Sequence, residues 1–132
     1  MRKVATKLEQ FRVALSIIFP KTKLTTATRT TVILFKSDDG FRPFKPRYKG
    51  KIEDEVGGYF LSGPQMNYMV LAAGETRGVS PYEIIFHEYE HSVTHNNFLR
   101  IPAWLDEGLA EFYSSFETSD QDKKATLGSP IA

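Results

Sequence analysis

The segment Ser80–Asn97, "SPYEIIFHEYEHSVTHNN", constrains this chain more than any other part of its sequence. It opens like a helix start, with a serine to cap the helix, Pro81 at the first helical position and Glu83 at the third, as in a capping box. We expect the helix to end at its two asparagines, because asparagine tolerates left-handed backbone. On this helix His87 and His91 are four residues apart, so both rings lie on the same face.

Two imidazoles on one helix face can ligate the same metal ion. Zinc accepts imidazole nitrogen at about 2.0–2.1 Å, and a catalytic zinc ion has three protein ligands and one position open to water. Glu88 is rotated about 100° from His87, too far to ligate with the pair, but it can reach a water at the open position. The pattern therefore predicts metal-assisted hydrolysis with Glu88 as the general base.

The third ligand must come from another segment, and it must be a carboxylate because the chain has no cysteine. The segment 103–116, "AWLDEGLAEFYSSF", has helical apolar spacing and carries Glu107 and Glu111 four residues apart. One of these carboxylates can ligate the ion while the other hydrogen-bonds the far nitrogen of a ligating histidine. Gly108, between them, is expected to let the two helices approach closely.

The remaining elements follow from periodicity and turn residues. We expect an amphipathic helix over Lys3–Phe19, a buried strand at Thr30–Phe35 and a long surface loop over Phe41–Glu55. The runs Gly58–Leu61 and Asn67–Ala72 are typical of a hairpin with a loop longer than two residues. The order of helix, strand, hairpin, helix and helix predicts an α+β domain.

The composition argues against several classes of protein. The 17 Lys and Arg nearly balance the 16 Asp and Glu, which disfavours a nucleic-acid partner that is bound through its phosphates. The absence of cysteine excludes disulfides and thiolate zinc sites. The longest apolar run, Val13–Phe19, is far short of the roughly 20 residues of a membrane span, and no secretory leader is visible. We expect a soluble chain, and the compartment stays open.

The motif pair of this sequence resembles a known family. His87–His91, "HEYEH", followed by Trp104–Glu111, "WLDEGLAE", resembles the gluzincin metallopeptidases, in which the glutamate of a W-L-x-E-G-x-A motif is the third zinc ligand. The chain is similar to the bacterial peptidase MA-like group, which is often joined to tetratricopeptide repeats. The runs "FRPF", "GYFLSGPQMNY" and "NNFLRIPAWLDEGLAEFYSSFE" extend the similarity over most of the chain.

The resemblance implies a role for each matching residue. His87, His91 and Glu107 would hold one zinc ion, Glu88 would act as general base and acid, and Glu111 would be the supporting carboxylate. The reverse assignment, with Glu111 on zinc and Glu107 in support, is the alternative.

The resemblance also implies a fold and a substrate. Residues 1–132 would form a single zincin-like metallopeptidase domain, trimmed at one or both ends, with a small twisted sheet, the motif helix beneath it and the glutamate helix behind. Its partner would be a peptide or protein substrate, in the bacterial cytoplasm or periplasm, and the full-length protein would carry fused tetratricopeptide repeats. An edge strand of the Gly58–Ala72 hairpin would pair with extended substrate, unless the hairpin only completes the sheet.

Gluzincins usually bring a tyrosine or histidine from downstream to stabilise the oxyanion. Only Tyr113 lies in that direction here, and the possible substitutes are Tyr48, Tyr59 and Tyr68. No G-x-M-E-N segment precedes the histidines, so an aminopeptidase is not indicated.

Four further residues near the motifs have simpler expected roles. His95 lies eight helical residues, about 12 Å, from His87, so it should interact with the helix dipole instead of sharing the ion. We expect Glu90 to be a solvated charge or an ion-pair partner, Trp104 to anchor the core, and Asp106 to cap the helix or face solvent.

Three alternatives remain beside the zinc peptidase. A surface helix with incidental histidines is the first, although the motif would arise in only roughly one shuffled sequence in 200. The second is a catalytically inactive zinc-binding module that serves structure or partner binding. The third is a hydrolase that uses the same ion on another amide or ester.

Overall fold

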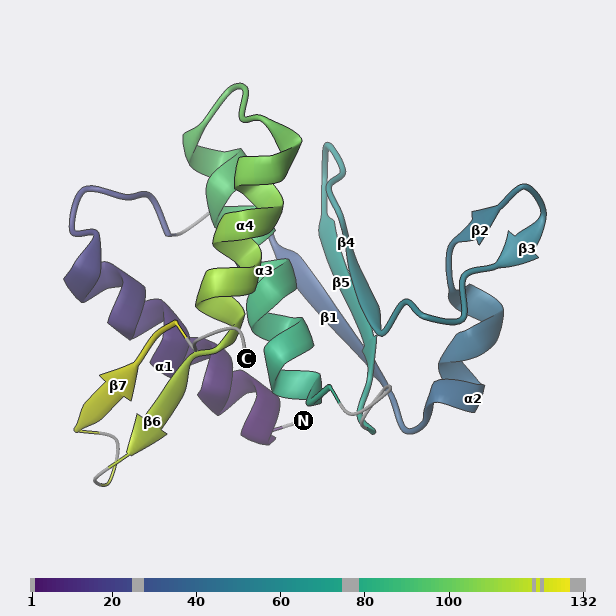
Figure 1. The fold of residues 1–132 in the computed structure, drawn as a ribbon, viewed down its shortest axis with the longest axis horizontal. Coiled ribbons are helices and arrows are strands. Elements are labelled where there is room, and N and C mark those ends of the chain that lie inside the picture. The colour runs from purple at the N-terminus through teal and green to yellow at the C-terminus, as the bar shows by residue number, and fades with distance from the viewer. Residues whose placement is uncertain (1, 25–27, 75–78, 120, 122, 129–132) are drawn as a thin grey trace.

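The computed structural model describes residues 2–24, 28–74, 79–119, 121 and 123–128, which form an α+β fold with four helices and a small mixed sheet (Figure 1). The helices are α1 (Arg2–Ile18), α2 (Asp38–Phe41), α3 (Pro81–Asn97) and α4 (Ala103–Ser114), with a short 3₁₀ turn at Arg42–Phe44. The strands are β1 (Thr30–Phe35), β2 (Arg47–Tyr48), β3 (Lys51–Ile52), β4 (Gly58–Leu61), β5 (Asn67–Ala72), β6 (Glu117–Ser119) and β7 (Lys124–Thr126).

The main sheet has the strand order β1-β5-β4, with β1 parallel and β4 antiparallel to β5. Except at Tyr68, the central strand β5 is buried, and its successive side chains point to opposite faces of the sheet. Met69 and Leu71 join the larger core beside the long helices, whereas Val70 and Ala72 pack around Phe41 of α2. The expected hairpin is confirmed as β4 and β5.

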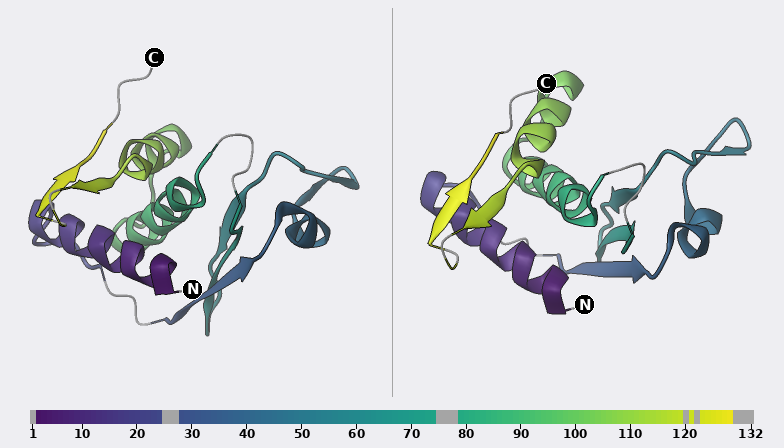
Figure 2. Two further views of the ribbon diagram at one scale, coloured as in Figure 1. Left: turned by 90° about the horizontal axis from the view of Figure 1, so that it is seen from below. Right: turned by 60° about the horizontal axis from the view of Figure 1, so that its bottom comes forward.

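Helices α1, α3 and α4 group on one side of this sheet and α2 lies on the other (Figure 2). Helix α3 contacts β4, β5, α1 and α4, so it is the helix that joins the sheet to the outer helices. Three aromatic rings pack together beside α3. The ring centroid of Phe11 of α1 lies 4.7 Å from that of Phe86 of α3, and the centroid of Phe116 lies 5.2 Å from each. This aromatic contact joins α3 to α1 and to the segment that follows α4.

Both ends of α3 lie where the sequence predicts them. The Ser80 hydroxyl accepts a hydrogen bond from the Tyr82 N–H at 3.2 Å, and Pro81 opens the helix. The reason for the C-terminal end differs from the prediction, because the described non-glycine residues with left-handed backbone lie elsewhere. Instead, the Asn97 side chain accepts from the Lys23 N–H and donates to the Lys23 carbonyl, both at 2.9 Å. These bonds fix the end of α3 to the segment after α1.

The prediction of a long surface loop over Phe41–Glu55 is wrong. The segment contains the end of α2, the 3₁₀ turn and the small β2–β3 hairpin, and Phe41 is fully buried. Lys45 is buried as well. Its buried charge is compensated because the ammonium pairs with Asp38 at 2.7 Å and donates a hydrogen bond to the Asp54 carbonyl at 2.8 Å. Prolines and charges suggested a loop, but Phe41 covers the second face of the sheet.

Strand β1 forms at the predicted residues, but it is half-exposed instead of buried because it lies at an edge of the sheet. The β6–β7 hairpin after α4 was not predicted. Among the described helices, none is both long and apolar enough to span a membrane.

Candidate metal centre

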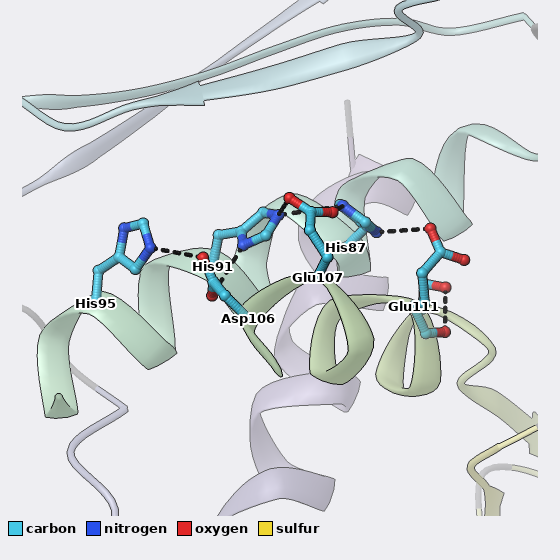
Figure 3. A network of polar contacts seen from close by, with 7 residues as sticks. His87, His91, His95, Asp106, Glu107 and Glu111 are labelled. Carbon is cyan, nitrogen blue, oxygen red and sulfur yellow. Dashed lines mark hydrogen bonds and ion pairs between the residues drawn. The ribbon is translucent and has the colours of Figure 1, made fainter. Parts of the chain in front are cut away.

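Helix α3 places the His87 and His91 rings side by side on the face that packs against α4 (Figure 3). The Nε2 atoms of the two rings lie 3.1 Å apart, and the ring planes are nearly perpendicular, at 79°. Both side chains are mostly buried, with 20% and 12% of their surfaces exposed. The four-residue spacing therefore brings two potential ligand atoms to one point.

Helix α4 brings a carboxylate to the same point. Glu107 Oε2 lies 3.4 Å from His87 Nε2, and Glu107 Oε1 lies 3.4 Å from His91 Nε2. Two ligand atoms that are each about 2.0–2.1 Å from a tetrahedral zinc ion lie about 3.3–3.4 Å apart. The two 3.4 Å separations involve different oxygens of Glu107, and one ligand atom from each of the three residues lies within 4.8 Å of the other two, so the three side chains are close enough to share one ion. Glu107 is 62% exposed, which leaves one side of this position open to solvent.

Two further carboxylates lie beside the other nitrogen of each ring. Glu111 Oε1 is 3.3 Å from His87 Nδ1, and Asp106 Oδ1 is 3.2 Å from His91 Nδ1. Glu111 thus occupies the place expected of a supporting carboxylate, and Glu107 the place expected of the ligand. The reverse assignment is disfavoured, because Glu111 lies on the side of the His87 ring that faces away from His91.

The four ring nitrogens have one consistent arrangement of protons. Carboxylates beside both Nδ1 atoms favour a proton on each of these nitrogens. Burial, followed by the neighbouring His91, lowers the pKa of His87 and so favours its neutral form. The two Nε2 lone pairs and the Glu107 carboxylate then point at one small volume. A cation would relieve the repulsion among these electron pairs, so this group of side chains could hold a metal ion.

Glu88 lies on a different face of α3, towards β4. It lines a cavity of about 380 Å³ together with His87, Glu111 and Gly58. Burial raises the pKa of Glu88 to about 7, against the lowering effects of His91 and of a hydrogen bond with the Phe60 backbone. A carboxylate that titrates near neutral pH can both accept and return a proton.

A close approach of β4 to α3 forms one wall of this cavity. A Cβ atom built on Gly58 would lie 2.6 Å from Ile84 Cγ2 and 3.0 Å from the Val70 carbonyl oxygen. A larger residue at this position would therefore push the strand away from the helix that carries Glu88.

Asp106 was expected to cap the helix or face solvent, and this prediction is wrong. Its side chain is only 14% exposed, and it bridges two histidines: Oδ1 faces His91 and Oδ2 lies 2.9 Å from His95 Nε2. Burial opposes its ionisation, but the contacts with His95 and His91 outweigh burial and keep the pKa of Asp106 below its ordinary value. His95 lies in the last turn of α3, as the dipole prediction requires, and Asp106 is its specific partner.

Three other expectations near the centre are wrong. Glu90 is 5% exposed and accepts a hydrogen bond from the Thr94 hydroxyl, so it is no solvated charge. Trp104 is 75% exposed and does not anchor the core. A Cβ atom on Gly108 would meet nothing within 4 Å, so this glycine is not what lets the helices approach.

The tyrosines considered for an oxyanion role lie in other surroundings. Tyr113 is buried in the main core, and Tyr59 donates a hydrogen bond to the Phe44 carbonyl at 3.0 Å. Tyr48 and Tyr68 are 64% and 38% exposed on β2 and β5. An oxyanion-stabilising side chain stays unassigned among the described residues.

No family model matches the chain, and neither a curated protein nor a solved structure is similar enough to count as a match.

Proposed function

We propose that this chain is a zinc-dependent metallopeptidase domain of the zincin type, similar to the gluzincins of the peptidase MA-like group. One observation carries the proposal: the Nε2 atoms of two histidines lie 3.1 Å apart, and each lies 3.4 Å from one of the two Glu107 carboxylate oxygens. These atoms come from two helices, and the residue types are the nitrogen and oxygen ligands that zinc prefers.

A zinc ion held by His87, His91 and Glu107 would activate a water for attack on a peptide carbonyl and polarise that carbonyl. Glu88 would accept the proton of the attacking water and then donate it to the leaving amine. Its position in the cavity beside His87, and a pKa of about 7, suit both transfers at neutral pH.

The neighbouring carboxylates would hold the ligands in place. Glu111 and Asp106, at 3.3 and 3.2 Å from the two Nδ1 atoms, would fix the tautomers and the orientations of the rings. A fixed ring loses less entropy when it ligates, so these two residues would raise zinc affinity without touching the ion.

Strand β4 is the better candidate for substrate binding. It lies at a sheet edge and contacts α3, whereas β5 is paired on both sides and has no free edge. An extended peptide that pairs with β4 would lie beside Glu88, whose carboxylate already contacts the Phe60 backbone. Main-chain pairing of this kind would give affinity with little dependence on sequence.

The test measures zinc content and peptide cleavage together. Wild-type protein, Glu88→Gln and a control, Glu117→Gln on exposed strand β6, are loaded with zinc and incubated with a mixed peptide library that is analysed by mass spectrometry. We expect about one tightly held zinc in all three, and cleavage that falls roughly 10²- to 10⁴-fold only in Glu88→Gln.

Each alternative has its own outcome in this experiment. Stoichiometric zinc without cleavage in any variant contradicts the peptidase and indicates a non-catalytic zinc-binding module. Cleavage of esters or non-peptide amides alone, lost in Glu88→Gln, indicates another hydrolase. Absence of tight zinc in the wild type contradicts the metal centre itself.

A further inference from the structure

A second group of metal-ligating atoms lies on the other side of the His91 ring, away from Glu107 (Figure 3). His95 Nε2 is 2.9 Å from Asp106 Oδ2, and Asp106 Oδ1 is 3.2 Å from His91 Nδ1. One ligand atom from each of these three residues lies within 4.8 Å of the other two. His95 has no part in the proposed hydrolysis, whereas His91 and Asp106 belong to both groups of atoms.

Two atoms of this cluster are buried without a well-formed hydrogen bond. His91 Nδ1 and Asp106 Oδ1 are both shielded from solvent and lie 3.2 Å apart, but their geometry does not make a well-formed hydrogen bond. A buried polar atom left unsatisfied costs about 1–3 kcal/mol. A cation between them would satisfy both at once, which a water with its own protons does less well.

The cluster is also open to an ion from outside. The His95 side chain is 51% exposed, whereas Asp106 is 14% and His91 12% exposed. One ligand, the His95 imidazole, thus faces solvent, and the other two are buried. An ion can therefore bind His95 first and lose its water molecules as it binds the other two. Two imidazole nitrogens and one carboxylate suit zinc and its neighbours in the first transition row, and not magnesium or calcium.

We infer that His95, Asp106 and the Nδ1 face of His91 form a second divalent-metal position of the zinc class. It shares the His91 ring with the position at His87 and Glu107 and fills after that one. Two divalent ions on one ring repel each other, and the proton on His91 Nδ1 must leave to solvent as the second ion binds. Both effects make the second position the weaker one. The inference is independent of whether the chain hydrolyses peptides.

The competing explanation is a hydrogen-bond chain without metal, in which His95 merely holds Asp106 against His91. His95→Gln separates the two, because a glutamine amide can still donate a hydrogen bond to Asp106 but is a poor zinc ligand. His87→Ala removes a ligand only from the first position, and His91→Ala removes one from both.

The experiment is equilibrium dialysis of metal-free protein against increasing zinc, with bound metal counted by elemental analysis and folding checked by circular dichroism. We expect two zinc ions in the wild type, the weaker one lost in His95→Gln and His95→Ala, and only the tighter one lost in His87→Ala. His91→Ala should lose both.

One result would overturn the inference: His95→Gln and His95→Ala variants that bind as many zinc ions as the wild type. A His91→Ala variant that keeps the weaker zinc would contradict the three-residue set. If no zinc binds at the His87 position, His87→Ala will leave the number of bound zinc ions unchanged, while the His95 variants will lower it. The failure of the first zinc position can therefore be told apart from the failure of the second.

Discussion

The Nε2 atoms of His87 and His91 face each other across 3.1 Å on successive turns of α3. Two neutral imidazoles that direct lone pairs at each other at this distance are repelled unless a proton or a cation lies between them. The carboxylates beside both Nδ1 atoms hold the ring protons on the far sides, which leaves a cation as the better partner. Each prediction below follows from this pair or from the side chains packed around it.

Glu107 and Glu111 should differ in their effect on zinc affinity. Because Glu107 faces both Nε2 atoms, we expect Glu107→Gln to weaken zinc binding by more than about 100-fold. Glu111 contacts only His87 Nδ1, so Glu111→Gln should cost no more than the roughly 10- to 100-fold typical of a supporting residue. Competition with a chelating dye measures both, and the opposite ranking would make Glu111 the ligand.

The pH dependence of hydrolysis should report Glu88. The base must be ionised, so kcat/KM should fall as pH falls through the pKa of Glu88, which burial raises to about 7. A bound cation lowers that pKa, so we expect the acid limb at or below this value. A rate that is constant from about pH 5 to 8, with zinc occupancy verified at each pH, would assign the base to another group.

The stability of the metal-free protein should depend on Glu90. Burial raises the pKa of this carboxyl from 4.5 to about 7, so its stabilising contribution is complete below 4.5 and is lost as pH rises through about 7. Glutamine imitates the neutral acid at every pH and can still accept from Thr94. We therefore expect Glu90→Gln to be more stable than wild type by about 1–3 kcal/mol at pH 8, and nearly equal at pH 4.5.

Urea denaturation with a chelator present measures this difference. The Ser119→Thr variant, at an exposed position of β6, is a control for a change outside the core and should leave the pH dependence of the wild type intact. A Glu90→Gln protein that is less stable than wild type at pH 8 would contradict the argument, because it would mean that the charged carboxylate is stabilised by its surroundings.

Trp104 and Phe86 should respond very differently to truncation. Trp104 is 75% exposed, so Trp104→Ala should change the free energy of unfolding by no more than about 0.5 kcal/mol. Phe86 is 2% exposed and packs against Phe11 and Phe116, so Phe86→Ala should cost about 3–5 kcal/mol. A large loss at Trp104 would show that its ring is buried in solution.

Local signals predicted the three long helices and the three strands of the main sheet, but they missed α2, the 3₁₀ turn and both small hairpins. Pro81 and the Ser80 hydroxyl mark the start of α3, and the residues of β1, β4 and β5 follow from runs of β-branched and aromatic residues. These features depend on neighbours a few residues away. Burial of β1 was overestimated because strand order, which puts β1 at an edge, is set by the whole sheet.

What the sequence could not supply is how α4 lies across α3. Spacing alone placed Glu107 and Glu111 on one face, but the packing of the two helices decides that Asp106 also turns inward between His91 and His95. The same packing leaves Trp104 outside and places Glu90 in the interior. The third histidine, four residues after His91, was the available signal, since this spacing puts it on the same helix face and so towards α4.

The measurement that tests the central claim most directly is anomalous X-ray scattering on either side of the zinc absorption edge, from crystals grown with one equivalent of zinc. We predict one strong peak between α3 and α4, about 2.0–2.2 Å from His87 Nε2, His91 Nε2 and a carboxylate oxygen of Glu107. A peak that lies elsewhere, or a zinc ion bound by the histidines without Glu107, would contradict it.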